Sequence, residues 1–169
     1  MLCRQGEKMA VPRYDKSAHG GEGDTADKEN WPLVTGSLDI VLFEGWMLGF
    51  CPVGAEKARQ AEEAMAQVDE YLKRYEPQWD SNVHSWLVIK VADPQWVHKW
   101  RLEAEQKMKA AGKEGMSDEG VTEFVNRYLP AYDTYLPGLY EEGPTTCQKG
   151  RTLFIEVDEH RQLIAAEAQ

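Results

Sequence analysis

Apolar residues gather along the chain in two patterns, short unbroken runs and longer stripes at helical spacing. Three runs lie at Leu38–Phe43, Ser85–Val91 and Thr152–Val157. They are rich in β-branched and aromatic residues and largely lack the polar alternation of a half-exposed strand. The pattern therefore predicts three buried strands in a sheet that is covered on both faces.

Helical stripes separate these runs. The first predicts one helix over Gly54–Tyr75 and consists of Ala58, Ala61, Met65, Val68 and Leu72. A second helix is expected over residues 93–112, and its stripe Trp96–Met108 is interpreted as core. A third begins at Ser117, with two acidic residues in its first turn. Strands that alternate with helices predict one α/β domain over residues 1–169, a three-layer parallel sheet with flanking helices.

Charge and cysteine content exclude some classes of partner and some kinds of site. The formal net charge is −10, which repels nucleic acid and anionic lipid, so neither is expected as a partner. Cys3, Cys51 and Cys147 are too scattered for a disulfide framework or a zinc site and suit a reducing compartment. No apolar run approaches the roughly 20 residues of a membrane span, and the first residues lack the apolar core of a signal peptide.

One acidic residue follows the first apolar run directly. Glu44 ends the predicted strand, and Gly45 lets the chain turn at once. Ligands collect at the carboxyl ends of parallel strands, where an acid can hold a Mg²⁺ shell. The alternative is a glutamate that caps a turn or pairs with a lysine.

A loop dense in small and polar residues occupies Val11–Asp24. Its glycines would let the backbone approach a ligand closely. Arg13, Lys16 and His19 are candidate partners for a carboxylate, and Tyr14 and Asp15 for hydroxyl groups. The alternative is a polar turn in which Asp15 bonds its own backbone.

Several long motifs in order resemble a known family. They are PRYDKSAHGGEGD, FEGWMLGF, DPQWVHKWRLEAEQKM, GMSDEGVTEFVNRYLPAY and YLPGLYEEGP. Together they are similar to D-glycerate 3-kinase of the plant and cyanobacterial type, roughly from Pro12 to Asp158. That family belongs to the P-loop kinases, near uridine kinase and phosphoribulokinase.

The resemblance implies a P-loop NTPase-like fold and transfer of a phosphoryl group from ATP to D-glycerate, with Mg²⁺. It implies Glu44 in the metal shell through water, an acceptor-binding loop in residues 13–19, and Arg101 reaching the phosphoryl group from a lid helix. Arg127 is a similar candidate on the nucleotide side. A solvated cationic helix face is the alternative for Arg101. The resemblance also implies the chloroplast stroma and photorespiration for a plant or alga, and otherwise the cytoplasm.

The phosphate-binding motif of these kinases is absent from the sequence. No G-x-x-x-x-G-K-[ST] pattern occurs, so we expect the C-terminal part of a kinase domain, with an incomplete sheet and no activity on its own. The alternative is a shortened, non-catalytic paralogue that acts as a binding or regulatory module. Glu22 and Thr25 favour it, because the family commonly has basic residues there. Oligomeric state cannot be read from the sequence.

Overall fold

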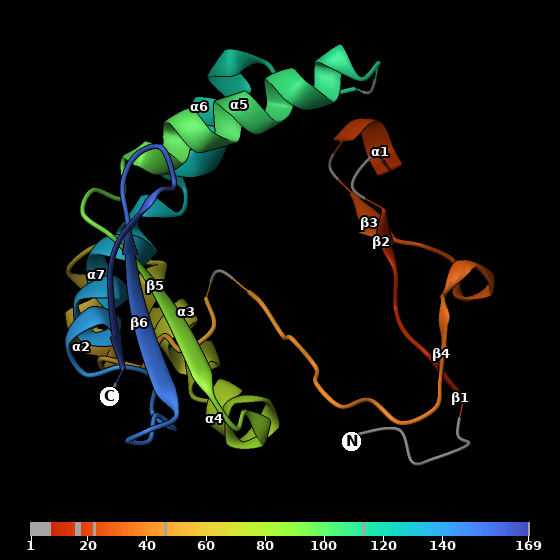
Figure 1. Cartoon of the computed structure of the whole chain (residues 1–169). Helices are drawn as coiled ribbons and strands as arrows, with labels where there is room; N and C mark the ends of the chain where they lie inside the picture. Colours follow the sequence, from red (N-terminus) through yellow and green to blue (C-terminus); the bar gives the residue numbers. More distant parts are fainter. Residues whose placement is uncertain (1–7, 16–17, 22, 46, 113, 169) are drawn as a thin grey trace. The chain divides into compact units, whose positions relative to one another are not determined.

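The chain divides into two units. The computed structural model describes residues 8–15, 18–21, 23–45, 47–112 and 114–168 (Figure 1). Contacts along the chain group Met1–Glu44 with Arg101–Val121, and Gly45–Trp100 with Thr122–Gln169. We call these the first and the second unit and describe each by itself.

A three-stranded sheet forms the centre of the second unit. Its strands are β5 (Trp86–Val91), β6 (Thr152–Val157) and β7 (Leu163–Ala168), in the order β5-β6-β7. β5 and β6 are parallel, which confirms two of the three predicted strands, whereas β7 runs antiparallel to β6. The sheet is therefore mixed: the predicted parallel pairing is present between β5 and β6, and β7 adds an antiparallel strand that the sequence pattern did not predict.

Helices cover one face of this sheet. They are α2 (Ala55–Arg59), α3 (Met65–Leu72), α4 (Tyr75–Gln78) and α7 (Leu129–Glu141), with a 3₁₀ turn at Asp80–Asn82. Figure 1 draws α2, α3 and α7 behind β5 and β6, and one apolar core joins them to the sheet. Its buried members are Phe50, Ala58, Met65, Leu72, Val88, Ala131, Tyr135, Leu139 and Phe154.

The predicted single helix over Gly54–Tyr75 is broken into two pieces, α2 and α3. The carboxylate of Asp69, which is fully buried, accepts hydrogen bonds from the N–H groups of Val53 at 2.7 Å and Gly54 at 3.2 Å. In a continuous helix, residues 16 positions apart would be about 24 Å apart. The chain must therefore fold back between α2 and α3, although residues 60–64 contain good helix formers.

Two helices link the units along the chain. α5 (Trp96–Ala110) and α6 (Asp118–Asn126) form where the sequence predicts them. The sequence predicts that the stripe Trp96–Met108 belongs to the core. This is only partly correct, because Ala104 is exposed and the one buried residue of α5 is Glu105.

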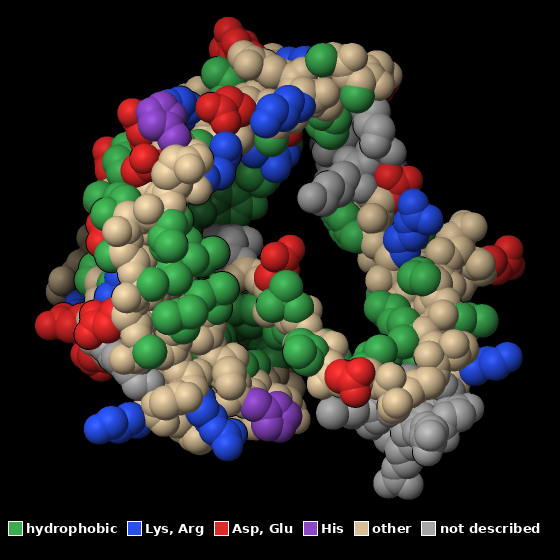
Figure 2. Space-filling model, viewed as in Figure 1, with side chains coloured by type: hydrophobic (Ala, Val, Ile, Leu, Met, Phe, Trp, Pro, Cys, Tyr) green, Lys and Arg blue, Asp and Glu red, His purple; other side chains and the backbone are tan. Residues whose placement is uncertain are grey.

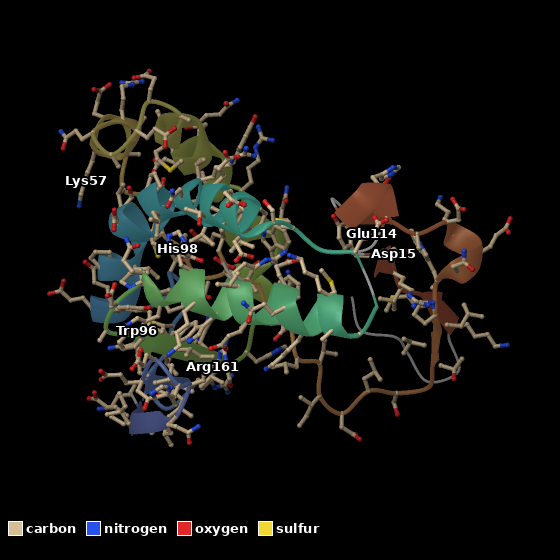
Figure 3. The ribbon with its side chains drawn as sticks, turned by 90° about the horizontal axis from the view of Figure 1, so that it is seen from above. Asp15, Lys57, Trp96, His98, Glu114 and Arg161 are labelled. Carbon is tan, nitrogen blue, oxygen red and sulfur yellow. The ribbon has the colours of Figure 1, made fainter. Side chains whose placement is uncertain are left out.

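The turn between β6 and β7 holds the first turns of α5. The indole N–H of Trp100 donates to the carbonyl of Glu159 at 2.7 Å, and the guanidinium of Arg161 lies 5.0 Å from the Trp100 ring centroid. Lys99 pairs with the Glu159 carboxylate at 3.3 Å. Figure 3 shows Trp96 and Arg161 at this same end of α5. Trp100 thus packs on a turn, Trp96 lies beside it with ring centroids 6.2 Å apart, and neither is among the buried residues of the main core.

The first unit contains short paired strands. β1 (Lys8–Ala10) pairs antiparallel with β4 (Leu33–Thr35), and β2 (Tyr14–Asp15) with β3 (Asp24–Thr25). α1 (Ala18–Gly21) lies within the β2–β3 connection, and a 3₁₀ turn, Lys28–Asn30, precedes β4. Sequence reasoning predicted only a loop here.

The strand predicted at Leu38–Phe43 is absent from the described structure. The run is irregular, and no described strand pairs with it. Ile40 is 86% exposed and Leu42 is 83% exposed. An apolar run becomes a buried strand only where a neighbouring strand satisfies its backbone groups, and the described residues provide none here.

Candidate functional site

A hairpin presents most of the predicted acceptor-binding residues. Tyr14 and Asp15 form β2 and are exposed, as is Arg13 just before them. The Ala26 N–H donates to the carbonyl of Arg13 at 2.8 Å and extends the pairing by one residue. Lys16, the remaining cation of this set, lies outside the described residues, as does Glu22.

His19 is held by a carboxylate that sequence reasoning did not single out. Its Nε2 lies 3.1 Å from Oδ2 of Asp24, across the turn that joins β2 and β3. Oδ1 of Asp24 accepts the Thr25 N–H at 2.6 Å. The hydrogen bond from His19, followed by that from Thr25, holds the pKa of Asp24 below its ordinary value. The imidazole thus lies against the Asp24 carboxylate, and both side chains remain exposed. Its signal in the sequence is an acid five residues after a histidine in a glycine-rich loop.

Gly23 has a structural role within the hairpin. Its φ is +83°, which favours glycine, and a Cβ there would lie 2.4 Å from the Tyr14 hydroxyl oxygen. The close approach that this glycine permits is therefore to the Tyr14 ring of the same hairpin.

Glu44 is exposed at the end of the irregular run over residues 38–43. The expected setting, the carboxyl end of a strand, is wrong for the described structure. What remains is an accessible carboxylate followed by a glycine.

Arg101 is held by a buried acid on its own helix. Its Nη2 lies 2.5 Å from Oε1 of Glu105, which is only 2% exposed. Oε2 of Glu105 accepts the N–H of Met116 at 3.0 Å, and a Cβ on Gly115 would lie 2.8 Å from this oxygen. One carboxylate thus ties α5 to the segment before α6 and fixes the direction of the guanidinium. Sequence reasoning missed Glu105 because a glutamate on a helix is usually solvated.

The predicted residues fall on different parts of the chain. Arg13, Tyr14, Asp15 and His19 share one hairpin, whereas Glu44 and Arg101 lie on other segments of the first unit. Arg127 is exposed after α6, in the second unit.

The second unit has a cleft that contains none of the predicted residues. It has a volume of about 530 Å³ and lies between the α2 region and α7. Its polar lining includes Lys57, Gln60, Asp133, Thr134 and Glu142. These residues come from two segments far apart in the sequence, so no local pattern reveals the cleft.

The described residues contain neither a ready-made cluster of metal ligands nor a helix that could span a membrane. Within the described ranges, no three His, Cys, Asp or Glu side chains come together as metal ligands. A Mg²⁺ ion that is bound together with phosphate groups needs fewer protein ligands, since one or two carboxylates, waters and the phosphates complete its shell. The accessible Glu44 carboxylate fits that role. Each helix in the described part of the chain is too short or too polar to cross a bilayer.

Comparisons with known proteins point to kinases. No family model matches the chain. It is 49% identical over 165 residues to the chloroplastic D-glycerate 3-kinase of Arabidopsis thaliana, a match that covers 98% of this chain and 36% of the relative. It is 36% identical over 140 residues to an uncharacterised kinase of Schizosaccharomyces pombe, covering 77% of this chain and 50% of the relative. The solved structure of D-glycerate 3-kinase from Cryptococcus neoformans aligns with a TM-score of 0.80 at 33% identity, over 96% of this chain and 60% of that one.

The chain is thus related to a class of phosphotransferases, the kinases. Within that class, it is homologous to part of the D-glycerate 3-kinases over nearly its whole length, which confirms the resemblance of its motifs. The mixed α/β fold is likewise similar to a solved kinase. The chain spans about a third of the length of the plant relative and half that of the fission-yeast one.

Proposed function

We propose that the chain is the C-terminal part of an ATP-dependent D-glycerate 3-kinase. The observation that carries this proposal is the 49% identity over 98% of the chain to a protein of that name. In the reaction, the bond between the γ-phosphorus of ATP and its bridging oxygen breaks. The 3-hydroxyl oxygen of D-glycerate bonds to that phosphorus and loses its proton, and the products are ADP and 3-phosphoglycerate.

The hairpin would bind the acceptor. D-Glycerate carries one carboxylate and two hydroxyl groups, so it needs cations and polar partners at short range. Arg13, Lys16 and His19 would hold the carboxylate, and Tyr14 and Asp15 the hydroxyl groups. The exposed positions of Arg13, Tyr14, Asp15 and His19 support this assignment.

Arg101 and Glu44 would act on the phosphate side. Phosphoryl transfer is catalysed mostly by positioning and by neutralising charge on the transferring group. The Glu105 carboxylate orients the Arg101 guanidinium in advance, so less side-chain freedom is lost when it meets the phosphoryl group. Glu44 would hold Mg²⁺ through water, and Arg127 would contact the nucleotide. Since this sequence has no G-x-x-x-x-G-K-[ST] loop, the cradle for the ATP phosphates would come from polypeptide outside it.

The proposal also covers location. The plant relative is named chloroplastic. For a plant or algal source we place the whole protein in the chloroplast stroma, in photorespiratory recovery of glycerate, and for any other source in the cytoplasm. The second candidate is a non-catalytic binding module, favoured by Glu22 and Thr25 at positions where the family commonly has basic residues.

A chimera separates the two candidates. Residues 1–169 replace the matching part of the Arabidopsis kinase, and ATP-dependent phosphorylation of D-glycerate, uridine and ribulose 5-phosphate is measured. We expect turnover of D-glycerate and negligible turnover of the other two. A folded chimera that phosphorylates none of them would overturn the kinase assignment and support the module, and equal turnover of uridine would overturn the substrate.

A further inference from the structure

The cleft of the second unit is lined by two residues that helices normally avoid. Pro137 and Gly138 lie in the interior of α7, and both line the cleft of about 530 Å³ between α7 and the α2 region. Proline and glycine are the least favourable residues inside a helix. The cleft belongs to the helix layer, whereas Figure 2 shows the side of the strands, where hydrophobic side chains gather. α7 thus gives up helix stability at the wall of a separate, polar cleft.

Packing does not explain the glycine at position 138. Its φ lies outside the left-handed region, and a Cβ added there would meet no heavy atom within 4 Å beyond its own helix backbone. A side chain would therefore fit. Its absence keeps the wall open and lets a ligand approach the backbone closely, in a cleft of the size that small molecules occupy.

Pro137 leaves a backbone acceptor at the same wall. Proline has no N–H, so the carbonyl of Asp133, one turn earlier, lacks its usual helical donor. Asp133 and Thr134 also line the cleft. The Thr134 hydroxyl donates to the carbonyl of Pro130 at 2.6 Å, and its oxygen can still accept a hydrogen bond. This group of acceptors suits an ammonium group, which has three donors and no acceptor.

The charges of the lining define the ligand further. The cleft is lined by two acids, Asp133 and Glu142, and by one cation, Lys57, which Figure 3 shows at the edge of the second unit. Among the described residues, none of the three has an ion-pair partner. Glu142 follows the last turn of α7, where the helix dipole also favours a cation. A complementary ligand carries two cationic groups and one anionic group.

The spacing of the acids gives the length of the ligand. Asp133 and Glu142 are about 13 Å apart along the axis of α7, from a rise of about 1.5 Å per residue. A molecule whose two nitrogens are joined by five carbons spans about 7.5 Å when extended, and a charged hydrogen bond of about 2.8 Å at each end brings the total to about 13 Å.

We propose that this cleft binds a basic α-amino acid of the size of lysine. Its two ammonium groups pair with Asp133 and Glu142, and its carboxylate pairs with Lys57. The inference does not rest on the proposed function, because none of the residues assigned to phosphoryl transfer lines the cleft.

The test compares three probes that differ by one charged group. L-Lysine has all three groups, L-norleucine lacks the second ammonium, and 1,5-diaminopentane lacks the carboxylate. Each is titrated into residues 1–169 and into the chimera, by calorimetry and by the NMR shift of the Gly138 amide. We expect saturable binding of L-lysine with a Kd of about 1 mM, and binding of the other two at least about tenfold weaker.

Variants assign each charge. Asp133→Asn and Glu142→Gln should each weaken L-lysine binding at least about tenfold, and only one of them should weaken L-norleucine. Lys57→Gln should weaken L-lysine but not 1,5-diaminopentane. The matched control is Glu141→Gln, the exposed neighbour that does not line the cleft, and it should change nothing. Gly138→Leu fills the wall with a better helix former, so Tm should rise while L-lysine binding is lost.

Several results would overturn the proposal. They are a folded chain without saturable L-lysine binding, equal affinity for either comparison probe, and L-lysine binding that survives Gly138→Leu. An inactive chimera that binds L-lysine as expected would refute only the proposed function, and an active chimera that does not bind it would refute only this inference.

Discussion

Replacing Glu105 by alanine should release the segment between α5 and α6. The buried carboxylate makes two contacts that alanine cannot make, one to Nη2 of Arg101 and one to the N–H of Met116. Because Glu105 is 2% exposed, water cannot readily replace them. The perturbation is therefore local and specific to one side chain.

The magnitude follows from the lost hydrogen bond. A hydrogen bond to a charged group contributes about 1.5–3 kcal/mol. At about 1.4 kcal/mol for each factor of ten, the Met116 amide should exchange with solvent about 10- to 150-fold faster in Glu105→Ala. Glu105→Gln keeps an acceptor oxygen and should raise the rate by less than about tenfold.

The assay is residue-resolved hydrogen exchange on the chain at neutral pH. Gln106→Ala is the matched control, since Gln106 is the exposed neighbour on the same helix. The Met116 rate should be unchanged in that variant. If Glu105→Ala also left the Met116 rate unchanged, the carboxylate would not hold this segment, and the argument that Arg101 is pre-oriented would fail.

Four further outcomes are expected. In the chimera, Lys16→Ala should raise the KM for D-glycerate more than the KM for ATP, and the reverse order would move Lys16 to the nucleotide side. In the same protein, Glu44→Gln should lower kcat at least about tenfold, which is about 1.4 kcal/mol of barrier, whereas an unchanged kcat with a lower Tm would make Glu44 structural. Burial, and then the charge of Asp69, raises the pKa of Tyr135 above its ordinary value of 10.0, so the folded state holds this proton more tightly than the unfolded state does. The resulting stability is present below about pH 10 and is lost above it, and urea unfolding of Tyr135→Phe should therefore show a shallower loss between pH 10 and 11; an identical slope would refute the linkage. Residues 1–169 alone should show no saturable Mg-ATP binding by calorimetry and no glycerate kinase activity, and a cooperatively melting chain that binds ATP would contradict this.

Local signals predicted the elements that depend on local physics. β5 and β6 are short β-branched runs, and α5 and α6 form close to the ranges that the sequence predicts. α7 was missed because Pro130 and Pro137 lie within it. The first occupies the first turn, where no N–H is needed, and the second interrupts the pattern that would otherwise indicate a helix.

Elements that depend on distant partners could not be predicted. The break between α2 and α3 follows from a buried Asp69 that bonds the backbone at Val53 and Gly54. The run Leu38–Phe43 has the composition of a strand but no described neighbour to pair with. In both cases the sequence pattern is locally correct, and a contact made elsewhere decides the conformation.

The candidate site shows the same division. Residue types and motifs identified the exposed hairpin and Arg101. The partners that hold them, Asp24 and Glu105, became visible only when the β2–β3 pairing and the α5–α6 connection were known. Supporting carboxylates of this kind have no strong pattern of their own in the sequence.

The most direct measurement of the central claim is the ratio of kcat/KM for D-glycerate to that for uridine in the chimera, with the product assigned by phosphorus NMR. The account predicts a ratio of at least about 100 and 3-phosphoglycerate as the product. A ratio near one, or a folded chimera with no glycerate turnover, would contradict it.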